Sequence, residues 1–105
     1  MTLLTQCVII RFMIKSFRDK ETEKLFKREL SRKIPKTIQQ IARRKLEILD
    51  AAEVIPDLRI PPSNHLEKLT GKRKGQHSIR INIQWRVCFE WRKGDAYNVE
   101  IVDYH

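Results

Sequence analysis

Residues 77–104, HSIRINIQWRVCFEWRKGDAYNVEIVDY, decide the fold of this 105-residue chain. Apolar side chains recur at every second position through three runs of this stretch, which is the pattern of strands that bury one face. The runs are 77–83, 85–91 and 96–104, and the turn sequence RKGD separates the last two. The stretch therefore predicts a three-stranded antiparallel meander.

The same alternation assigns side chains to the two faces of the predicted sheet. In the middle strand the large apolar side chains share one face: Trp85, Val87, Phe89 and Trp91. In the other two strands the groups are Ile79, Ile81 and Ile83, and then Tyr97, Val99, Ile101 and Asp103. If helices cover the apolar face, Arg86 stands on the open face, toward solvent or a ligand.

A short strand over 13–17 and a first helix are expected before the meander. Asp19 can cap a helix over about 20–32, because its carboxylate can accept a hydrogen bond from a free amide of the first turn. The apolar stripe of this helix is Leu25, Phe26 and Leu30.

A second helix is expected over about 35–53. Pro35 suits its first turn, and apolar residues then recur at spacings of three and four. Lys45 is the charged residue in that stripe, and its aliphatic stem can snorkel toward water. The order β-α-α-β-β-β predicts an α+β domain with the two helices packed on one face of a small, mainly antiparallel sheet.

Positive charge is concentrated in the first half of the chain. The formal net charge is +9, and residues 11–45 hold thirteen lysines and arginines against four acids. A small domain this basic implies an anionic partner, either nucleic acid or an acidic protein. The proline-rich stretch 55–64 reads as a connection, and LTGKRKGQ (69–76) reads as a basic loop.

The cysteines and histidines show no metal-ligand spacing, so neither a metal nor another cofactor is expected. The two cysteines fit a reducing cytoplasm. The opening MTLLTQCVIIRF (1–12) is too short to span a bilayer and wrongly flanked for a signal peptide. We expect 1–12 to be an N-terminal extension, for which an upstream start is one origin, and 13–105 to be a single cytoplasmic domain with no membrane attachment.

Candidate site residues lie on the middle strand and at the end of the chain. A guanidinium fixed on a rigid strand suits a phosphate, although Arg86 could instead pair with Glu90 or Glu100 across the sheet. The chain ends with Asp103, Tyr104 and His105. An imidazole titrates near pH 6.5 and can serve as acid or base, or it can simply be an exposed tail residue.

Two basic groups are candidate contacts for an anionic partner. The loop group is Lys72, Arg73 and Lys74, and the helical group is Lys36, Arg43 and Arg44. The loop could grip a phosphodiester with help from glycine-flanked amides, or it could be a solvated hairpin tip. The helical charges could likewise be a solvated face.

Three stretches resemble the HigB-type growth-inhibiting toxins (plasmid-maintenance killer proteins) of the RelE superfamily. They are MIKSFRDKETEKLF (13–26), LEKLTGKRKGQHSIRINIQWRVCFEW (66–91) and VEIVDYH (99–105). The resemblance implies a microbial-RNase-like fold and the toxin half of a type II toxin–antitoxin pair. It further implies a metal-independent endoribonuclease that cuts messenger RNA in the ribosomal A site, and a helix-turn-helix antitoxin as partner.

The resemblance also implies roles for particular residues. It makes Arg86 the phosphate stabiliser and Asp103, Tyr104 and His105 the C-terminal part of the catalytic surface. Tyr104 would stack on the flanking base, and His105 would be the general acid.

This chain departs from relatives that carry a histidine and then a lysine in an H-P-L-K-G stretch. It has Glu67 and Thr70 in those places. Other members share the glutamate, so Glu67 or His105 is expected to be the base. Thr70 removes a positive charge beside the scissile phosphate, for which Lys68 or Lys72 would compensate.

Two other classes of function stay open. One is a non-catalytic basic toxin that blocks translation or another target by occupation alone, since superfamily relatives that poison gyrase share this architecture. The other is a basic structural domain bound by an acidic partner, which would cause no growth defect on expression.

Overall fold

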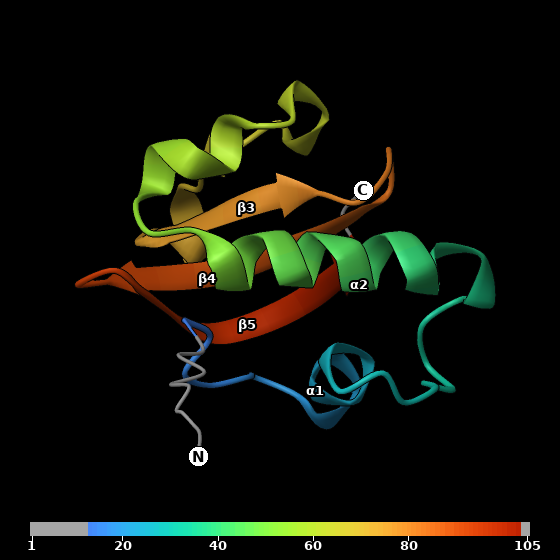
Figure 1. The fold of residues 1–105 in the computed structure, drawn as a ribbon. Helices are drawn as coiled ribbons and strands as arrows, with labels where there is room; N and C mark the ends of the chain where they lie inside the picture. The colour runs from blue at the N-terminus through green and yellow to red at the C-terminus, as the bar shows by residue number, and fades with distance from the viewer. Residues whose placement is uncertain (1–12, 104–105) are drawn as a thin grey trace, which may run out of the picture.

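The predicted meander forms three neighbouring strands of the sheet, β3 (Gln76–Arg80), β4 (Trp85–Arg92) and β5 (Asp95–Asp103). The structure is a computed structural model, and it describes residues 13–103. A short strand, β2 (Glu67–Lys68), extends the sheet to four antiparallel strands in the order β2-β3-β4-β5. With its two helices this is the expected α+β arrangement (Figure 1). The predicted extension 1–12 lies outside the described residues.

The core lies between the sheet and the helix α2 (Lys36–Ala51). In Figure 1, α2 crosses in front of the strands, while α1 (Lys20–Phe26) lies beside β5. Val87 and Phe89 of β4 are fully buried in the same apolar cluster as Leu46 and Leu49 of α2. Burying a side chain of this size contributes roughly 1.5–3 kcal/mol. The face of β4 that alternation assigned to the helices is therefore confirmed.

Helix α1 starts as predicted and ends earlier than predicted. Asp19 caps it, with Oδ2 accepting from the Thr22 amide at 3.4 Å. The helix ends at Phe26 rather than near residue 32, because Arg28 adopts a left-handed conformation with φ +66°. Leu30 is consequently 75% exposed, and its predicted place in a buried stripe is wrong.

Helix α2 agrees with its predicted range to within two residues at each end, but Lys45 does not snorkel. The side chain is buried, and its Nζ donates to Asn64 Oδ1 at 2.6 Å. Burial lowers the pKa of Lys45, and the neighbouring Arg44 lowers it further. Ile41, three residues after Ile38 and therefore part of the expected apolar stripe, is 41% exposed.

The expected first strand, 13–17, forms two isolated parallel bridges to β5 rather than a strand. The bridges pair Ile14 with Ala96 and Phe17 with Val99. Asp50 near the end of α2 holds this segment, because its Oδ1 accepts from the amides of Met13 and Ile14 at 2.8 and 3.0 Å.

Two face assignments within the meander are wrong for local reasons. Ile83 is 83% exposed, because β3 ends at Arg80 and the Asn82 side chain folds 82–85 into a turn. Tyr97 pairs with Glu90 on the open face, because a β-bulge shifts the register between Cys88 and Glu90. An extra residue in one strand reverses the alternation beyond it.

The connection before β2 contains two 3-10 turns, η1 (Ile55–Arg59) and η2 (Pro62–Asn64), and the basic loop contains a third, η3 (Gly71–Arg73). Within residues 13–103, no helix combines the length and the apolar character that a bilayer crossing requires.

Candidate active site

One row of side chains crosses the open face of the sheet from edge to edge. Glu67 lies opposite Ser78, Ser78 opposite Cys88, and Cys88 opposite Glu100. Residues paired across antiparallel strands project to the same side. Since Val87 and Phe89 point into the core, this row lies on the face that the helices leave uncovered.

Arg86 lies next to this row and is held in place by several contacts. Its Nε donates to Ser78 Oγ at 2.7 Å, and its Nη2 donates to the His65 carbonyl at 2.6 Å. Nη2 is also 3.7 Å from Glu67 Oε1. Only 12% of the side chain is exposed. The guanidinium is thus fixed over β3 and directed toward β2, on the open face where the sequence placed it.

The carboxylates expected as alternative partners of Arg86 have other contacts. Glu90 accepts from Arg92 at 2.6 Å and from Asn98 at 3.0 Å, contacts that lower its pKa. Glu100 is in ion pairs with Arg73 and Arg18. Within residues 13–103, the carboxylate beside Arg86 is Glu67, whose side chain is 56% exposed at the sheet edge. This places an accessible base next to an immobilised cation.

The basic loop divides into one anchored arginine and two exposed lysines. Arg73 turns back onto the sheet, and its Nη1 donates to Gln76 Oε1 at 3.1 Å and Glu100 Oε1 at 3.2 Å. Lys72 and Lys74 are exposed. Lys68 is opposite His77, so it projects to the helix side of the sheet and is not on the face of Arg86.

The chain terminus is described only as far as Asp103. This residue lies opposite Trp85, and its Oδ1 accepts from Gln84 Nε2 at 3.1 Å. The register therefore places Asp103 on the helix side of the sheet rather than beside Arg86. Tyr104 and His105 lie outside the described residues.

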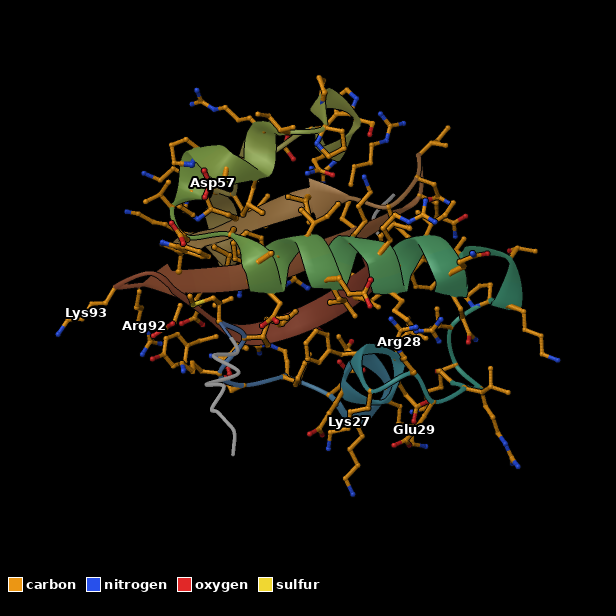
Figure 2. The ribbon with its side chains drawn as sticks, in the orientation of Figure 1. Lys27, Arg28, Glu29, Asp57, Arg92 and Lys93 are labelled. Atoms are coloured by element: carbon orange, nitrogen blue, oxygen red, sulfur yellow. The ribbon has the colours of Figure 1, made fainter. Side chains whose placement is uncertain are left out.

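The basic residues of α2 lie in the helix layer, away from the open face of the sheet. Figure 2 labels two other exposed cations of this layer, Lys27 and Arg28. Lys36 and Arg44 are exposed, whereas Arg43 donates from Nε to the Leu25 carbonyl at 3.1 Å and ties α1 to α2. None of these three α2 residues shares the face that carries Arg86.

Two titratable side chains close to the row are neutral and structural. Burial raises the pKa of the Cys88 thiol, which lies within the row among the charges of Arg73, Glu100, Arg86 and Glu67. His77 faces the helices and stacks on Phe89 at 6.0 Å. Burial, together with the charge of Lys68, lowers the pKa of His77. The thiol is therefore protonated at neutral pH, and His77 lies on the opposite face of the sheet from Arg86.

The site includes contacts that sequence reasoning missed, namely Ser78, the His65 carbonyl, Gln76, Glu100 and Arg18. Ser78 could have been found by alternation, since it faces the same way as Arg86 on the adjoining strand. In the part of the chain from 13 to 103, no group of three or more His, Cys, Asp or Glu side chains is placed to hold a metal ion.

Comparison with known proteins gives consistent matches. Residues 15–105 match the family described as the RelE-like toxin of the type II toxin–antitoxin system HigB. Toxin HigB-1 of Vibrio cholerae is 47% identical over 87 residues, which cover 82% of this chain and 92% of that protein. Endoribonuclease HigB of Proteus vulgaris is 33% identical over 93 residues, covering 89% of this chain and all of that protein. An uncharacterized protein of Haemophilus influenzae is 40% identical over 67 residues, covering 64% and 66%.

Proposed function

The chain belongs to the HigB family of RelE-like toxins from type II toxin–antitoxin systems, and we propose that it is a metal-independent endoribonuclease that cleaves messenger RNA on the ribosome. The observation that carries this proposal is the anchored guanidinium of Arg86 beside the exposed carboxylate of Glu67. The name of the Proteus vulgaris relative, an endoribonuclease, supports the same activity.

The reaction needs a base, an acid and a cation around one phosphate. The base, Glu67 or His105, removes the proton of a 2′-hydroxyl, whose oxygen then forms a bond to the adjacent phosphorus. The bond from phosphorus to the 5′-oxygen breaks, and His105 protonates that oxygen. The products are a 2′,3′-cyclic phosphate and a free 5′-hydroxyl. Positioned proton transfer of this kind is worth about 10²–10⁴-fold in rate.

Arg86 stabilises the negative charge that develops on the phosphorane. Ser78 and the His65 carbonyl already hold its guanidinium, so little reorganisation is needed when the charge appears. Removing one such preorganised donor costs about 10²–10³-fold in rate.

The C-terminal residues complete the proposed site. Asp103, bound to Gln84 at the end of β5, positions the residues that follow it. Tyr104 stacks on the base next to the scissile phosphate, as aromatic side chains do in many single-stranded RNA readers. Thr70 lacks the positive charge of a lysine, and the exposed Lys72 of the same loop compensates through its charge rather than by contact with the scissile phosphate.

The proposed partners follow from the charge of the chain and from the family. Lys36, Arg43 and Arg44 contact ribosomal RNA, together with Lys74 and Lys68 at the edge of the sheet, and such contacts weaken as salt rises. The ribosome positions the substrate, which provides much of the acceleration. A cognate helix-turn-helix antitoxin neutralises the toxin, and the site of action is the cytoplasm.

The test is to induce the full chain in bacteria and map new 5′ ends on cellular messenger RNA. The wild type should arrest growth and produce cuts, whereas Arg86→Ala and a chain lacking His105 should lose both. Arg28→Ala is the matched control, because Arg28 is an exposed arginine of the helix layer paired with Glu47. Growth arrest that persists in both site variants, with normal folding, would show that the toxin acts by occupation.

A further inference from the structure

A second cationic cluster lies on the open face, at the opposite end of the row from Glu67. Its members are Arg18, Lys72, Arg73, Gln76 and Glu100, and they line a hollow of about 340 Å³. Glu67 on β2 and Glu100 on β5 are at the two ends of the row, so three spacings between neighbouring strands separate them. At about 4.8 Å per spacing, their backbones are about 14 Å apart. The guanidinium of Arg86 is directed the other way, toward Ser78, the His65 carbonyl and Glu67, and none of these groups lines the hollow. An anion in the hollow is therefore distinct from one at Arg86.

The two arginines of this cluster reach it from distant parts of the chain and share one carboxylate oxygen. Glu100 Oε1 is 3.2 Å from Arg73 Nη1 and 3.5 Å from Arg18 Nε. Arg73 Nη1 also donates to the buried Gln76. The backbone amide of Arg18 donates to the Val99 carbonyl at 2.9 Å, which fixes the start of that side chain next to β5.

The charge of the cluster is not balanced. Among the residues that line the hollow, three are cations (Arg18, Lys72 and Arg73) and one is a carboxylate (Glu100), which leaves two positive charges in excess. The neighbouring Glu90 also attracts Arg18, but its carboxylate already accepts from Arg92 and Asn98. An ordinary surface pair such as Arg28 with Glu47, 2.9 Å apart, is balanced by contrast. Guanidinium groups present planar forks of donors that match phosphate oxygens. A phosphodiester is therefore the anion that fits this hollow.

We infer that this cluster binds a second backbone phosphate of the RNA substrate, separate from the phosphate at Arg86. Glu100 is a positioning residue, because it holds Arg18 and Arg73 in orientations from which both can donate to the same phosphate. This inference rests on the proposed function, and it adds a binding subsite that fixes where the strand lies across the sheet.

The test measures binding of the full-length protein to a short single-stranded 2′-O-methyl RNA, which cannot be cleaved by 2′-hydroxyl attack. Fluorescence anisotropy over a range of salt concentrations gives both the affinity and the number of phosphates that the protein neutralises. For single strands, the slope of log K against log salt falls by about 0.7 for each phosphate that is no longer neutralised. Arg73→Gln and Arg18→Gln should each weaken binding about five- to tenfold and lower the slope by about that amount. Arg28→Gln, which removes an equal charge, should change affinity less than about twofold.

A matched pair of glutamate variants separates a built subsite from general positive charge. Glu100→Gln and Glu47→Gln each remove one carboxylate and release arginine from an ion pair. If only net charge matters, both variants bind RNA more tightly. If Glu100 positions the two arginines, Glu100→Gln binds about three- to fivefold more weakly, while Glu47→Gln does not weaken. Tighter binding by Glu100→Gln overturns the inference.

The outcomes also separate this inference from the proposed function. Thermal unfolding confirms that each variant is folded, and Arg18, nearly half exposed, provides a variant with little structural cost. If the wild type cuts messenger RNA but Arg18→Gln and Arg73→Gln bind the oligonucleotide as tightly as Arg28→Gln does, the subsite alone is overturned. A wild type that binds as expected but makes no cuts overturns the nuclease alone. A wild type that does not bind the oligonucleotide overturns the subsite.

Discussion

Two cations hold neighbouring residues of one segment from two sides of the molecule. Lys45 of α2 donates to the side-chain oxygen of Asn64, and Arg86 of β4 donates to the carbonyl of His65, both at 2.6 Å. Asn64 is fully buried, whereas His65 is exposed. Equal hydrogen-bond lengths thus occur in a structural position and in the candidate active site.

The difference between the two positions is access. The side-chain nitrogen of Asn64, Nδ2, donates to the carbonyls of Leu58 and Ile60 at 3.1 and 3.3 Å. The hydrogen bonds of the Lys45–Asn64 pair are therefore made to other groups inside the protein. The guanidinium of Arg86 instead lies at the surface of the sheet, next to the exposed carboxylate of Glu67. A buried cation whose partners are all internal stabilises the fold, whereas one held at the rim of a polar face can also bind an anion.

The largest effect on stability is expected from Lys45→Ala. The change leaves the oxygen of buried Asn64 without its donor and opens a cavity, so the free energy of unfolding should fall by about 3 kcal/mol. Urea denaturation measures this, and RNA cleavage per folded molecule should stay at the wild-type value. Arg44→Ala, on the exposed side of the same helix, should change stability by less than about 0.5 kcal/mol. Equal losses in the two variants would refute a structural role for the Lys45–Asn64 contact.

Arg86→Lys should show the reverse pattern, with activity lost and stability kept. A lysine retains the charge but cannot span Ser78 and the His65 carbonyl with a planar fork. We expect cleavage on the ribosome to fall about 30-fold, with the midpoint of thermal unfolding nearly unchanged. Wild-type cleavage by this variant would mean that charge alone suffices at this position.

A smaller effect is expected from Ser78→Ala, which removes the acceptor of Arg86 Nε. Loss of one such hydrogen bond is worth about 1 kcal/mol, or about fivefold in cleavage rate. Ser31→Ala is the matched control, because Ser31 is also buried but accepts from loop amides in the helix layer. The control should lower stability and leave the rate per folded molecule intact, and a rate loss in Ser31→Ala would contradict this division.

The smallest effect concerns pH and the helix side of the sheet. Because the pKa of His77 is lowered in the folded state, the unfolded chain takes up the proton first, near pH 6.5. Stability from this group is therefore present above pH 6.5 and is lost as pH falls below it.

His77→Phe should reduce the drop in unfolding midpoint between pH 7 and pH 5, since phenylalanine keeps the contact with Phe89 and does not titrate. His65→Asn is the control, because His65 is exposed and its φ of +43° suits asparagine. Identical pH profiles for wild type and His77→Phe would show that His77 is not linked to folding.

Sequence reasoning reached the parts of this molecule that depend on local alternation. Arg86 was assigned to the open face by its position between Trp85 and Val87, and the antiparallel register confirms that placement. The same reasoning failed for Tyr97, because a bulge that reverses alternation is set by pairing with the opposite strand. It failed for Leu30, because the chain turns away after α1 at the left-handed Arg28, and no proline or glycine marks that turn in the sequence.

The sequence by itself determined the order of the two helices and the three meander strands, the apolar face of β4 and the excess of positive charge, since all three follow from residue types at short spacings. Only the tertiary structure decided which charges meet. Lys45 with Asn64, and Glu100 with Arg73 and with Arg18, are separated by 19 to 82 residues along the chain. Their contacts depend on how helices and strands pack, and packing is set by the whole core rather than by any local pattern.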